Sequence, residues 1–533
     1  MQMTTSLSTN VQTAKEKIMA KWDVRVWVTA VLLLLVFVTG FAVVQYATPG
    51  LAGNDGYYHM KMGYLIRTEG LTPDFPYLPY TILNETAFYD HHLLYHVFLA
   101  LFATTDPALD GGLALTQGAK LASIIMPSLA FLAVWWLLRG QKVPYAAVFA
   151  VGLFAVSEAF LYRMSMPRAQ SLSLLLLVLG LHWLLQSNYK LLLPLGFVFV
   201  WAYNAFPLLL VVAGTYAIAT FMLERRIVWQ ALVYPAIGIG LGLVINPYFP
   251  ENIDFIVGHL LPKVGESSTP VGNEWSPYRT LTLVNNSGVA FLAALASILA
   301  LGWRDKRIDK PTLVSLGLMV LFGYMLFESR RFVEYFPPFA FIFFALSAAP
   351  LLRDWLKEWG GKRLLRHAQL RWAAQNRQYL PQLAPIALLL LLAYPLYVGL
   401  SDARELLADS KPADQYADAV IWLHDNAPDG TMVFQTDWDD FTRLFFYNSN
   451  AVYTAGLDPT FMELEDEAFY DRWVDITRGR VDAPGAAIRD EFGASYVFSD
   501  LNHDDFIDEA EDDPLLQEVY RDEYAVIYEV GNP

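Results

Sequence analysis

The chain has no cysteine among its 533 residues, and only 17% of its residues are charged. The absence of cysteine excludes disulfide bonds, thiolate nucleophiles and cysteine-bound zinc, so any metal ion must be held by oxygen or imidazole ligands. Apolar residues, by contrast, make up 55% of the chain, and the mean hydropathy is +0.33. A chain of this composition is too apolar to cover its own surface in water, and we expect it in a bilayer.

A convincing signal-peptide cleavage site is also lacking, because no small-residue motif follows the first apolar run at 24–44. We interpret this run as the first transmembrane helix, since about 20 apolar residues cross a bilayer. The same reasoning predicts a polytopic α-helical membrane protein with eleven spans, or up to thirteen. The eleven predicted spans are 26–46, 115–138, 143–162, 168–187, 190–205, 207–223, 229–247, 285–303, 311–327, 332–352 and 382–400.

Basic residues gather in short loops such as 139–142 and 225–226. With eleven spans these loops all fall on one side, which the positive-inside rule assigns to the cytoplasm. The N-terminus is then cytoplasmic and the C-terminus extracytoplasmic, in a plasma or inner membrane. Loops 47–114 and 248–284 lie outside with the C-terminal region, and the apolar segment 88–104 is expected to form an interfacial helix.

The distribution of charge divides the chain into 1–400, the transmembrane part, and 401–533, a soluble domain. Residues 401–533 hold 32 acidic and 8 basic residues, whereas the preceding 400 hold 21 acidic and 29 basic residues. Such an acidic domain excludes nucleic acid as a partner. Its patterning predicts an α/β domain with helices at 413–424 and 468–477. The predicted strands are 432–436, 451–454, 496–499 and 525–530.

Polar residues that suit chemistry begin directly after the first predicted span, in the sequence Asn-Asp-Gly-Tyr-Tyr-His at 54–59. A carboxylate such as Asp55 at the outer end of a membrane helix is costly unless it binds something. His59 lies four residues later, on the same helical face, and Tyr58 adds an aromatic ring. The alternative reading is that Asp55 only caps a helix.

A second polar group in the same loop is Tyr-Asp-His-His at 89–92, followed by His96. Imidazoles with carboxylates suit zinc or manganese, or a general base near neutral pH. His91 and His92 are therefore candidates for catalysis. Interfacial histidines that are bonded only to water are the alternative.

Two arginine-containing segments border the same predicted outer surface. One is 162–170, with Arg163 and Gln170, and the other is 328–335, with Arg331 and Tyr335. A guanidinium offers phosphate oxygens a permanently charged fork of donors. Anchoring at the membrane boundary is the alternative role for these arginines. Between the two segments, Glu274 follows a stretch rich in Gly, Ser and Pro, which is typical of a loop.

The last block, Asp-Trp-Asp-Asp-Phe at 437–441, follows a predicted strand of the soluble domain. An exposed acidic cluster is its plain interpretation. Together with the preceding blocks, in this order along the chain, it resembles the catalytic subunits of oligosaccharyltransferases, which are GT-C membrane enzymes. Trp438 and Asp439 match the second Trp and the Asp of the family's WWDYG motif. Two acidic residues of the family's second outer loop are replaced by Gln170 and Leu172, and the first Trp by Asp437.

The resemblance implies a GT-C-type transmembrane fold and a membrane glycosyltransferase. Its donor is a sugar or oligosaccharide on a polyprenyl (pyro)phosphate, and its acceptor is a protein or glycan on the extracytoplasmic side. Two alternatives stay open: a monosaccharide transferase that uses a polyprenyl monophosphate sugar, and a non-enzymatic carrier or scaffold for a lipid-linked glycan. The changed block at 437–441 leans away from strict recognition of an Asn-X-Ser/Thr sequon.

The resemblance, together with the chemistry of the histidines described above, predicts roles for individual residues and a divalent cation, Mn²⁺ or Mg²⁺. The catalytic candidates are Asp55, Glu274, His91 and His92. The candidates for binding the donor phosphate are Arg331, Arg163 and Tyr335. The candidates for binding the acceptor are Trp438, Asp439, Asp440 and Tyr58. The candidate metal ligands are Asp55, Glu274, His59 and Gln170.

Overall fold

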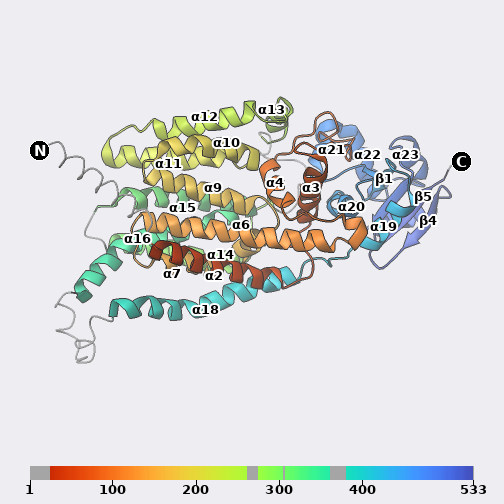
Figure 1. Cartoon of the computed structure of the whole chain (residues 1–533). Coiled ribbons are helices and arrows are strands. Elements are labelled where there is room, and N and C mark those ends of the chain that lie inside the picture. The colour runs from red at the N-terminus through yellow and green to blue at the C-terminus, as the bar shows by residue number, and fades with distance from the viewer. Residues whose placement is uncertain (1–23, 261–273, 304–306, 361–379, 532–533) are drawn as a thin grey trace, which may run out of the picture.

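The computed structural model describes residues 24–260, 274–303, 307–360 and 380–531. Long helices form an elongated bundle, and short helices and a small sheet cover one end of it (Figure 1). The chain enters the bundle at the end away from the sheet and finishes in the sheet domain. The described parts of all three predicted outer regions therefore meet at the end that carries the sheet.

Seven described helices are long and apolar enough to cross a membrane, and the chain is a multi-pass membrane protein. They are α2 (Val24–Gln45), α6 (Leu113–Gly140), α11 (Pro207–Glu224), α14 (Thr280–Gly302), α15 (Lys310–Glu328), α16 (Phe336–Gly360) and α18 (Leu380–Ala408). An eighth span is formed if α7 (Ala146–Gly152) with η1 (Leu153–Ala155) is joined to α8 (Glu158–Ser165), across a bend of 91°.

Three shorter apolar helices complete the bundle. They are α9 (Gln170–Leu185), α10 (Leu192–Ala202), which η2 (Tyr189–Leu191) precedes, and α12 (Gln230–Val244). Each of the eleven predicted spans thus contains a helix, so the helical membrane fold is confirmed. The number of spans that cross the bilayer stays a prediction, because a 15-residue helix such as α12 is only about 22 Å long.

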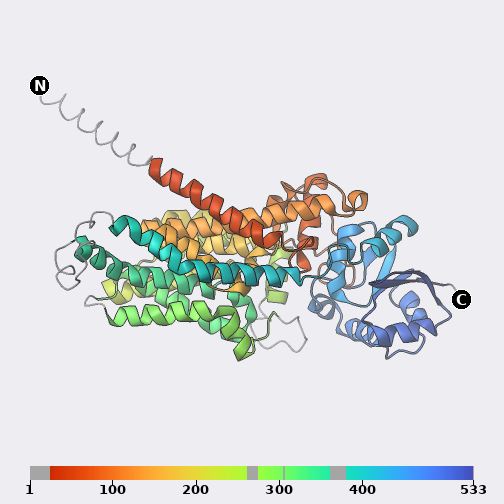
Figure 2. The same ribbon diagram turned by 90° about the horizontal axis from the view of Figure 1, so that it is seen from below.

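Burial separates central from peripheral helices. In α6, 72% of the apolar window is buried, against 17% in α2 and 11% in α18. The view in Figure 2 shows α2 running along the edge of the bundle. The apolar side chains of α2 and α18 therefore face lipid, whereas α6 packs on other helices.

At the end of the bundle nearest the sheet, the chain forms short helices that are not membrane spans. They are α3 (Asp55–Glu69), α4 (Leu93–Ala100), α5 (Pro107–Asp110) and α13 (Glu251–Phe255), which η3 (Ile256–Leu260) continues. Segment 88–104 contains only α4, whose eight residues extend about 12 Å and cannot cross a bilayer. Part of the predicted loop 248–284, residues 261–273, lies outside the described residues.

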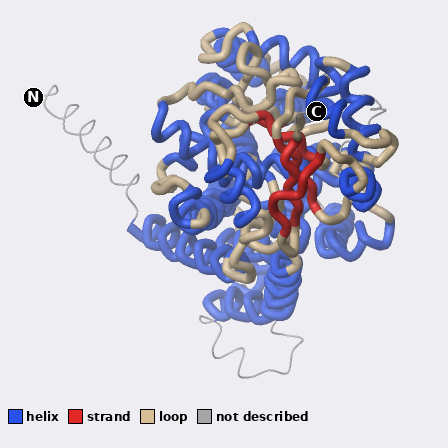
Figure 3. Tube along the Cα trace, turned by 90° about the vertical axis from the view of Figure 1, so that its right-hand side faces the viewer, coloured by secondary structure: helices blue, strands red, loops and turns tan. Residues whose placement is uncertain are grey.

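The sheet has five strands in the order β2-β1-β3-β5-β4. Their bounds are β1 (Met432–Gln435), β2 (Val452–Tyr453), β3 (Tyr496–Asp500), β4 (Leu516–Arg521) and β5 (Ala525–Val530). β1 runs parallel to β2 and β3, whereas β5 is antiparallel to β3 and β4. All four predicted strands are present, and β4 is an additional edge strand. Figure 3 shows the strands packed among helices.

Side chains alternate between the two faces of the sheet, as the period of two requires. Phe434, Val497 and Val526 share an apolar core with α22 (Glu467–Thr477), α23 (Gly485–Asp490) and α24 (Asp504–Glu511). The neighbouring residues Val433, Phe498 and Ile527 face a different core. That second core includes α19 (Ala417–Asn426), α20 (Phe441–Tyr447) and α21 (Thr460–Glu465).

The second core also includes side chains of the first outer loop, among them Tyr57 and Phe75. Backbone hydrogen bonds join the same parts, because Tyr453 N–H donates to the carbonyl of Tyr77 at 2.9 Å. The sheet domain and the loop before α6 are therefore built as one unit. The predicted domain division at residue 400 stays a prediction, since α18 runs through it to Ala408.

Candidate active site

Asp55 lies at the first position of α3, against the connection between α8 and α9. Gly56 makes this approach fit, because a Cβ atom on it would lie 2.2 Å from Cγ of Pro167. With the two segments this close, Asp55 Oδ2 lies 3.1 Å from a guanidinium nitrogen of Arg168. The Asp-Gly pair of the sequence thus serves one geometric purpose, which is to bring a carboxylate to Arg168.

Glu274 lies among three arginines from different parts of the chain. Its carboxylate pairs with Arg168 at 3.0 Å, with Arg331 at 3.5 Å, and with Arg163. Arg168 contacts both carboxylates, so Asp55 and Arg331 belong to one connected cluster. We call Arg163, Arg168 and Arg331 the arginine cluster.

Neighbouring groups fix the positions of this cluster. Glu334 is 2% exposed and pairs with Arg163, and its carboxylate accepts from Nε of Arg163 at 2.9 Å. The guanidinium of Arg331 lies 4.6 Å from the centre of the Trp275 ring. The three arginines and the three carboxylates of Asp55, Glu274 and Glu334 balance in formal charge.

The pKa of Glu274 shows how strongly the arginines act on it. Burial alone would raise this pKa, but Arg163, Arg168 and Arg331 hold it well below its usual range. The backbone of the loop is also fixed here, since the carbonyl of Glu274 accepts from the N–H of Arg331 at 3.2 Å. Glu274 is therefore an ionised carboxylate held where an anion can bind.

The histidines of the first outer loop form a second polar group. Nδ1 of His59, on α3, lies 2.7 Å from Nε2 of His96, on α4. Nδ1 of His96 in turn lies 2.7 Å from Oδ2 of Asp90. His59, His92 and His96 each offer a ring nitrogen, and these atoms lie within 4.8 Å of one another. Among the described residues this is a group that can hold a metal ion.

Burial favours the neutral form of the imidazoles of His59, His91 and His92. It lowers the pKa of His59 and of His92 well below the ordinary value, and neighbouring histidines lower both further. Burial also lowers the pKa of His91 to about 4, although Asp90 acts against it. The His91 ring stacks on Phe255 at 5.2 Å between centroids. Neutral rings suit metal binding or proton acceptance.

The soluble domain reaches the site through the block at 437–441. Asp439 accepts a hydrogen bond from the side-chain amide of Asn54 at 2.5 Å, beside Asp55, and lies 3.6 Å from Nζ of Lys411. Nε of Arg443 donates to Oδ1 of Asn54 at 3.3 Å. Asp439 is thereby close to Asp55, and Trp438 is half-buried against the core on the far side of the sheet.

Other predicted site residues point into the interior. Tyr58 is 4% exposed and packs among aromatic rings, and the hydroxyl of Tyr335 pairs with Ser173 at 2.8 Å inside the bundle. Asp440 is 1% exposed, and one of its oxygens has no hydrogen-bond partner. Burial, followed by the charges of Asp437 and Asp500, raises the pKa of Asp440 well above its usual range. In this conformation the side chains of Tyr58, Tyr335 and Asp440 are buried in the protein and do not face solvent at the site.

The ligand set predicted for the cation is not assembled. Asp55 and Glu274 direct their oxygens at arginines, and His59 pairs with His96. Gln170 is buried with both of its side-chain amide atoms unpartnered. These four residues do not fit a hard cation such as Mg²⁺, which needs several oxygen ligands free of competing positive charge. The three imidazoles fit a metal ion better.

Sequence reasoning missed several members of the site. Arg168 lies in the arginine-containing segment 162–170, but only the structure gives it the bridging position between Asp55 and Glu274. Asn54 and Arg443, which join the outer loop to the soluble domain, were not assigned roles. Glu334 was missed too. The sequence does carry a signal for Glu334, because it places this acidic residue inside the predicted span 332–352. A carboxylate in an apolar helix requires a basic partner.

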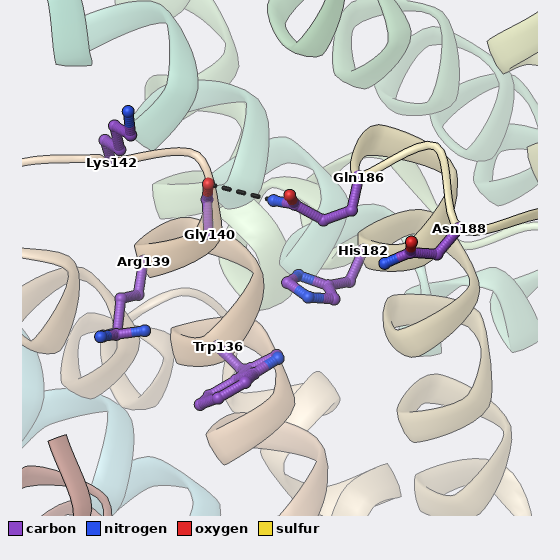
Figure 4. A pocket seen from close by; sticks show the side chains of 7 residues that line it. All are labelled: Trp136, Arg139, Gly140, Lys142, His182, Gln186 and Asn188. Atoms are coloured by element: carbon purple, nitrogen blue, oxygen red, sulfur yellow. Dashed lines mark hydrogen bonds between the residues drawn. The ribbon is translucent and has the colours of Figure 1, made fainter. Parts of the chain in front are cut away.

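A pocket of about 530 Å³ lies at the other end of the bundle, where α6 and α9 finish (Figure 4). Its lining residues are Trp136, Arg139, Gly140, Lys142, His182, Gln186 and Asn188. Figure 4 shows Gln186 donating to the carbonyl of Gly140, at 3.1 Å. No predicted site residue lines this pocket, so it is separate from the arginine cluster.

Comparisons with known proteins show which solved proteins share this fold. No family model matches the chain. Over 209 residues it is 30% identical to dolichyl-phosphooligosaccharide-protein glycotransferase 3 of Archaeoglobus fulgidus. That match covers 37% of this chain and only 23% of the relative, so the chain spans less than a quarter of that protein.

Two solved structures share most of the fold. The apo oligosaccharyltransferase of Archaeoglobus fulgidus gives a TM-score of 0.64 at 16% identity, over 88% of this chain and 69% of that one. ArnT of Cupriavidus metallidurans, bound to undecaprenyl phosphate, gives a TM-score of 0.58 at 15% identity, over 95% of this chain and 99% of that one.

The chain therefore has the fold of the GT-C membrane glycosyltransferases, with a C-terminal α/β domain. Within that class it shares its architecture with both the archaeal oligosaccharyltransferase and ArnT. The resemblance read from the sequence blocks is confirmed at the level of the fold.

Proposed function

We propose that this chain is a membrane glycosyltransferase that takes a sugar or oligosaccharide from a polyprenyl (pyro)phosphate and transfers it to a protein or glycan acceptor. The observation that carries the proposal is the convergence of Arg163, Arg168 and Arg331 beside Asp55. Three guanidiniums at the end of a membrane bundle are a binding site for phosphate. Glu274 occupies that site as a carboxylate.

The proposed mechanism depends on the attraction between the three arginines and the negatively charged phosphate of the donor. A phosphate group of the donor replaces the Glu274 carboxylate between the arginines, which keeps the cluster close to neutral. As the bond between the sugar and the phosphate breaks, the arginines stabilise the negative charge that develops on the leaving phosphate. Asp55 orients the acceptor nucleophile, and the neutral imidazole of His91 takes up its proton.

We infer that residues 1–400 hold the donor in the membrane and that 401–533 presents the acceptor. The block at 437–441 supports this, because Asp439 contacts Asn54 next to Asp55. The N-terminus is then cytoplasmic and the sheet domain extracytoplasmic, in the plasma or inner membrane, as the basic loops predict. Asp439 and the neighbouring Trp438, whose ring is half-buried, are the residues of this block that we propose to contact the acceptor.

The proposal is tested with Arg331→Ala in a strain that lacks the chain's own gene. Removing one donor to a developing oxyanion lowers turnover about 10²- to 10³-fold. We expect mass spectrometry to show loss of the glycan, and membranes to release less polyprenyl phosphate. Arg353→Ala is the matched control, since Arg353 is exposed at the far end and bonds to the carbonyl of Gln141. An unchanged glycan in cells that contain the folded Arg331→Ala protein contradicts the proposal and favours a carrier or scaffold.

A second candidate is a monosaccharide transferase that uses a polyprenyl monophosphate sugar. The match to ArnT favours it, because that match covers 99% of the ArnT chain but only 69% of the oligosaccharyltransferase. The second candidate releases a polyprenyl monophosphate, whereas the first releases a pyrophosphate when its donor carries one. A released polyprenyl pyrophosphate, detected by mass analysis, therefore excludes the second candidate.

A further inference from the structure

We propose that His59, His92 and His96 form a zinc site that is separate from the Asp55 and arginine cluster. One ring nitrogen of each lies within 4.8 Å of the others. Imidazole is a preferred ligand of Zn²⁺ and a poor one for Mg²⁺. Because the chain has no cysteine, a zinc site in it must use imidazole or oxygen ligands, and this cluster supplies three imidazoles.

The packing of two short helices brings the ligands together. His59 lies on α3, and His92 and His96 lie at the start of α4. Gly63, one turn after His59, lets these helices approach, since a Cβ atom there would lie 2.9 Å from Cβ of Leu99. The helices thus approach closely beside the three imidazoles. A metal ion at this point ties α3 to α4.

Asp90 gives the group the outer support that metal-binding histidines need. Its Oδ2 lies 2.7 Å from Nδ1 of His96, and its Oδ1 accepts the backbone N–H of His92 at 2.9 Å. A carboxylate on one ring nitrogen fixes the tautomer, so that Nε2 of His96 presents its lone pair. That Nε2 is the atom that faces His59.

The hydrogen bonds of the group leave one nitrogen atom of His92 unexplained. Its Nδ1 is buried and has no hydrogen-bond partner. A buried ring nitrogen without a partner costs free energy, and a metal ion satisfies it. The 2.7 Å between His59 and His96 fits a shared proton in the metal-free state. Zinc requires about 3.3 Å between tetrahedral ligand atoms, so the two rings turn apart slightly on binding.

Three protein ligands leave one position of a tetrahedral zinc open to water. The proposed ion lies one helical turn beyond Asp55 along α3, because His59 follows Asp55 by four residues. By holding α3 against α4, the ion fixes the helix whose first residue carries that carboxylate. The site is therefore a positioning device for Asp55, and its occupancy does not depend on the identity of donor or acceptor.

The test uses the full chain, purified in detergent, stripped with a chelator and reloaded with Zn²⁺. We expect elemental analysis to find about one zinc per chain, and X-ray absorption to find nitrogen ligands at about 2.0–2.1 Å. The variants His59→Ala, His92→Ala and His96→Ala are each expected to lose the ion. His424→Ala, at a partly exposed histidine of α19, is the matched control and keeps the ion.

Asp90→Asn provides a milder change in case the alanine variants do not fold. It keeps the size of the side chain, and we expect zinc affinity to fall about 10- to 100-fold. The inference is overturned if the His59→Ala, His92→Ala and His96→Ala variants hold as much zinc as the His424→Ala control. It is also overturned if the reloaded wild-type protein holds no zinc. Neither outcome touches the proposed transfer reaction, which the Arg331→Ala experiment tests independently.

Discussion

Arg163 shows how a single side chain is made part of a binding site. Its Nε and one terminal nitrogen contact the buried carboxylate of Glu334, which leaves the other terminal nitrogen directed at Glu274. The guanidinium plane is fixed from the protein side, and its free edge faces the place where an anion binds. Glu334 is thus a positioning residue, and its contribution is measurable as stability.

We expect Glu334→Leu to destabilise the protein by about 3–5 kcal/mol, because it removes a partner from a buried ion pair. Thermal unfolding in detergent measures the change. Glu491→Leu is the control, since Glu491 pairs with Arg472 on the surface at 2.8 Å, and exposed pairs contribute about 0–1 kcal/mol. Equal effects of the two substitutions are incompatible with a buried, rigid Arg163.

For individual residues, the sequence predicted which side chains belong to the site better than it predicted which of them contact one another. Asp55, Glu274 and Arg331 were predicted as site residues, and they lie in one connected cluster. Arg168 joins them, but nothing in its sequence neighbourhood distinguishes it from an anchor at the membrane boundary. Which arginine bridges two carboxylates depends on the approach of Gly56 to Pro167, and that contact joins segments more than 100 residues apart.

At the scale of elements, glycine decides which helices pack most closely. α10 and α12 meet through Gly196, Gly238 and Gly242. A Cβ atom at Gly238 would lie 2.0 Å from the carbonyl oxygen of Leu193, which belongs to the backbone and cannot move aside. Small residues at such contacts are typical of membrane helices, whose association depends on close packing.

Gly238→Ala is accordingly expected to destabilise the bundle by about 1–3 kcal/mol, the usual cost of overpacking. Gly240→Ala, two residues away on the same helix, meets no atom within 4 Å. Alanine there gains helix propensity, so we expect it to be neutral or stabilising by up to about 1 kcal/mol. The melting temperatures of the two variants in detergent should move in different directions, and a shared direction would contradict the packing.

Elements were predictable where their signal is local. Apolar runs gave a helix in each of the eleven predicted spans, and alternation gave four of the five strands. β4 escaped notice because its Gln517 and Glu518 are exposed at the edge of the sheet, which removes the apolar alternation. The short helices α20, α23 and α24 were not predicted either, because eight or fewer residues carry too little periodicity.

The whole molecule is held together by the interface between the first outer loop and the sheet domain. Arg443 is 1% exposed at this interface. One of its terminal nitrogens donates to the carbonyl of Pro412 at 2.8 Å, and its guanidinium lies 4.3 Å from the Tyr57 ring centre. Since Tyr57 and the sheet share one apolar core, we expect the loop and the sheet domain to unfold together.

Arg443→Met tests this coupling. The substitution leaves buried carbonyls without their charged donor, at a cost of about 2–3 kcal/mol. We expect a lower melting temperature and faster release of a C-terminal fragment in limited proteolysis. Arg478→Met, at an exposed arginine of the same domain, is the control and should change stability by less than about 0.5 kcal/mol. Release of the fragment at the wild-type rate would show that Arg443 does not hold the domain.

The sequence by itself determined that this is a helical membrane protein with an acidic α/β domain, because hydropathy, charge balance and short-range periodicity are local properties of the chain. It also determined most of the residues that form the arginine cluster. Only the tertiary structure decided that three arginines share Glu274, that three imidazoles meet away from Asp55, and that the outer loop completes the core of the sheet domain. Those arrangements join residues as far apart as Asn54 and Asp439, and such pairings are fixed by packing that no local pattern encodes.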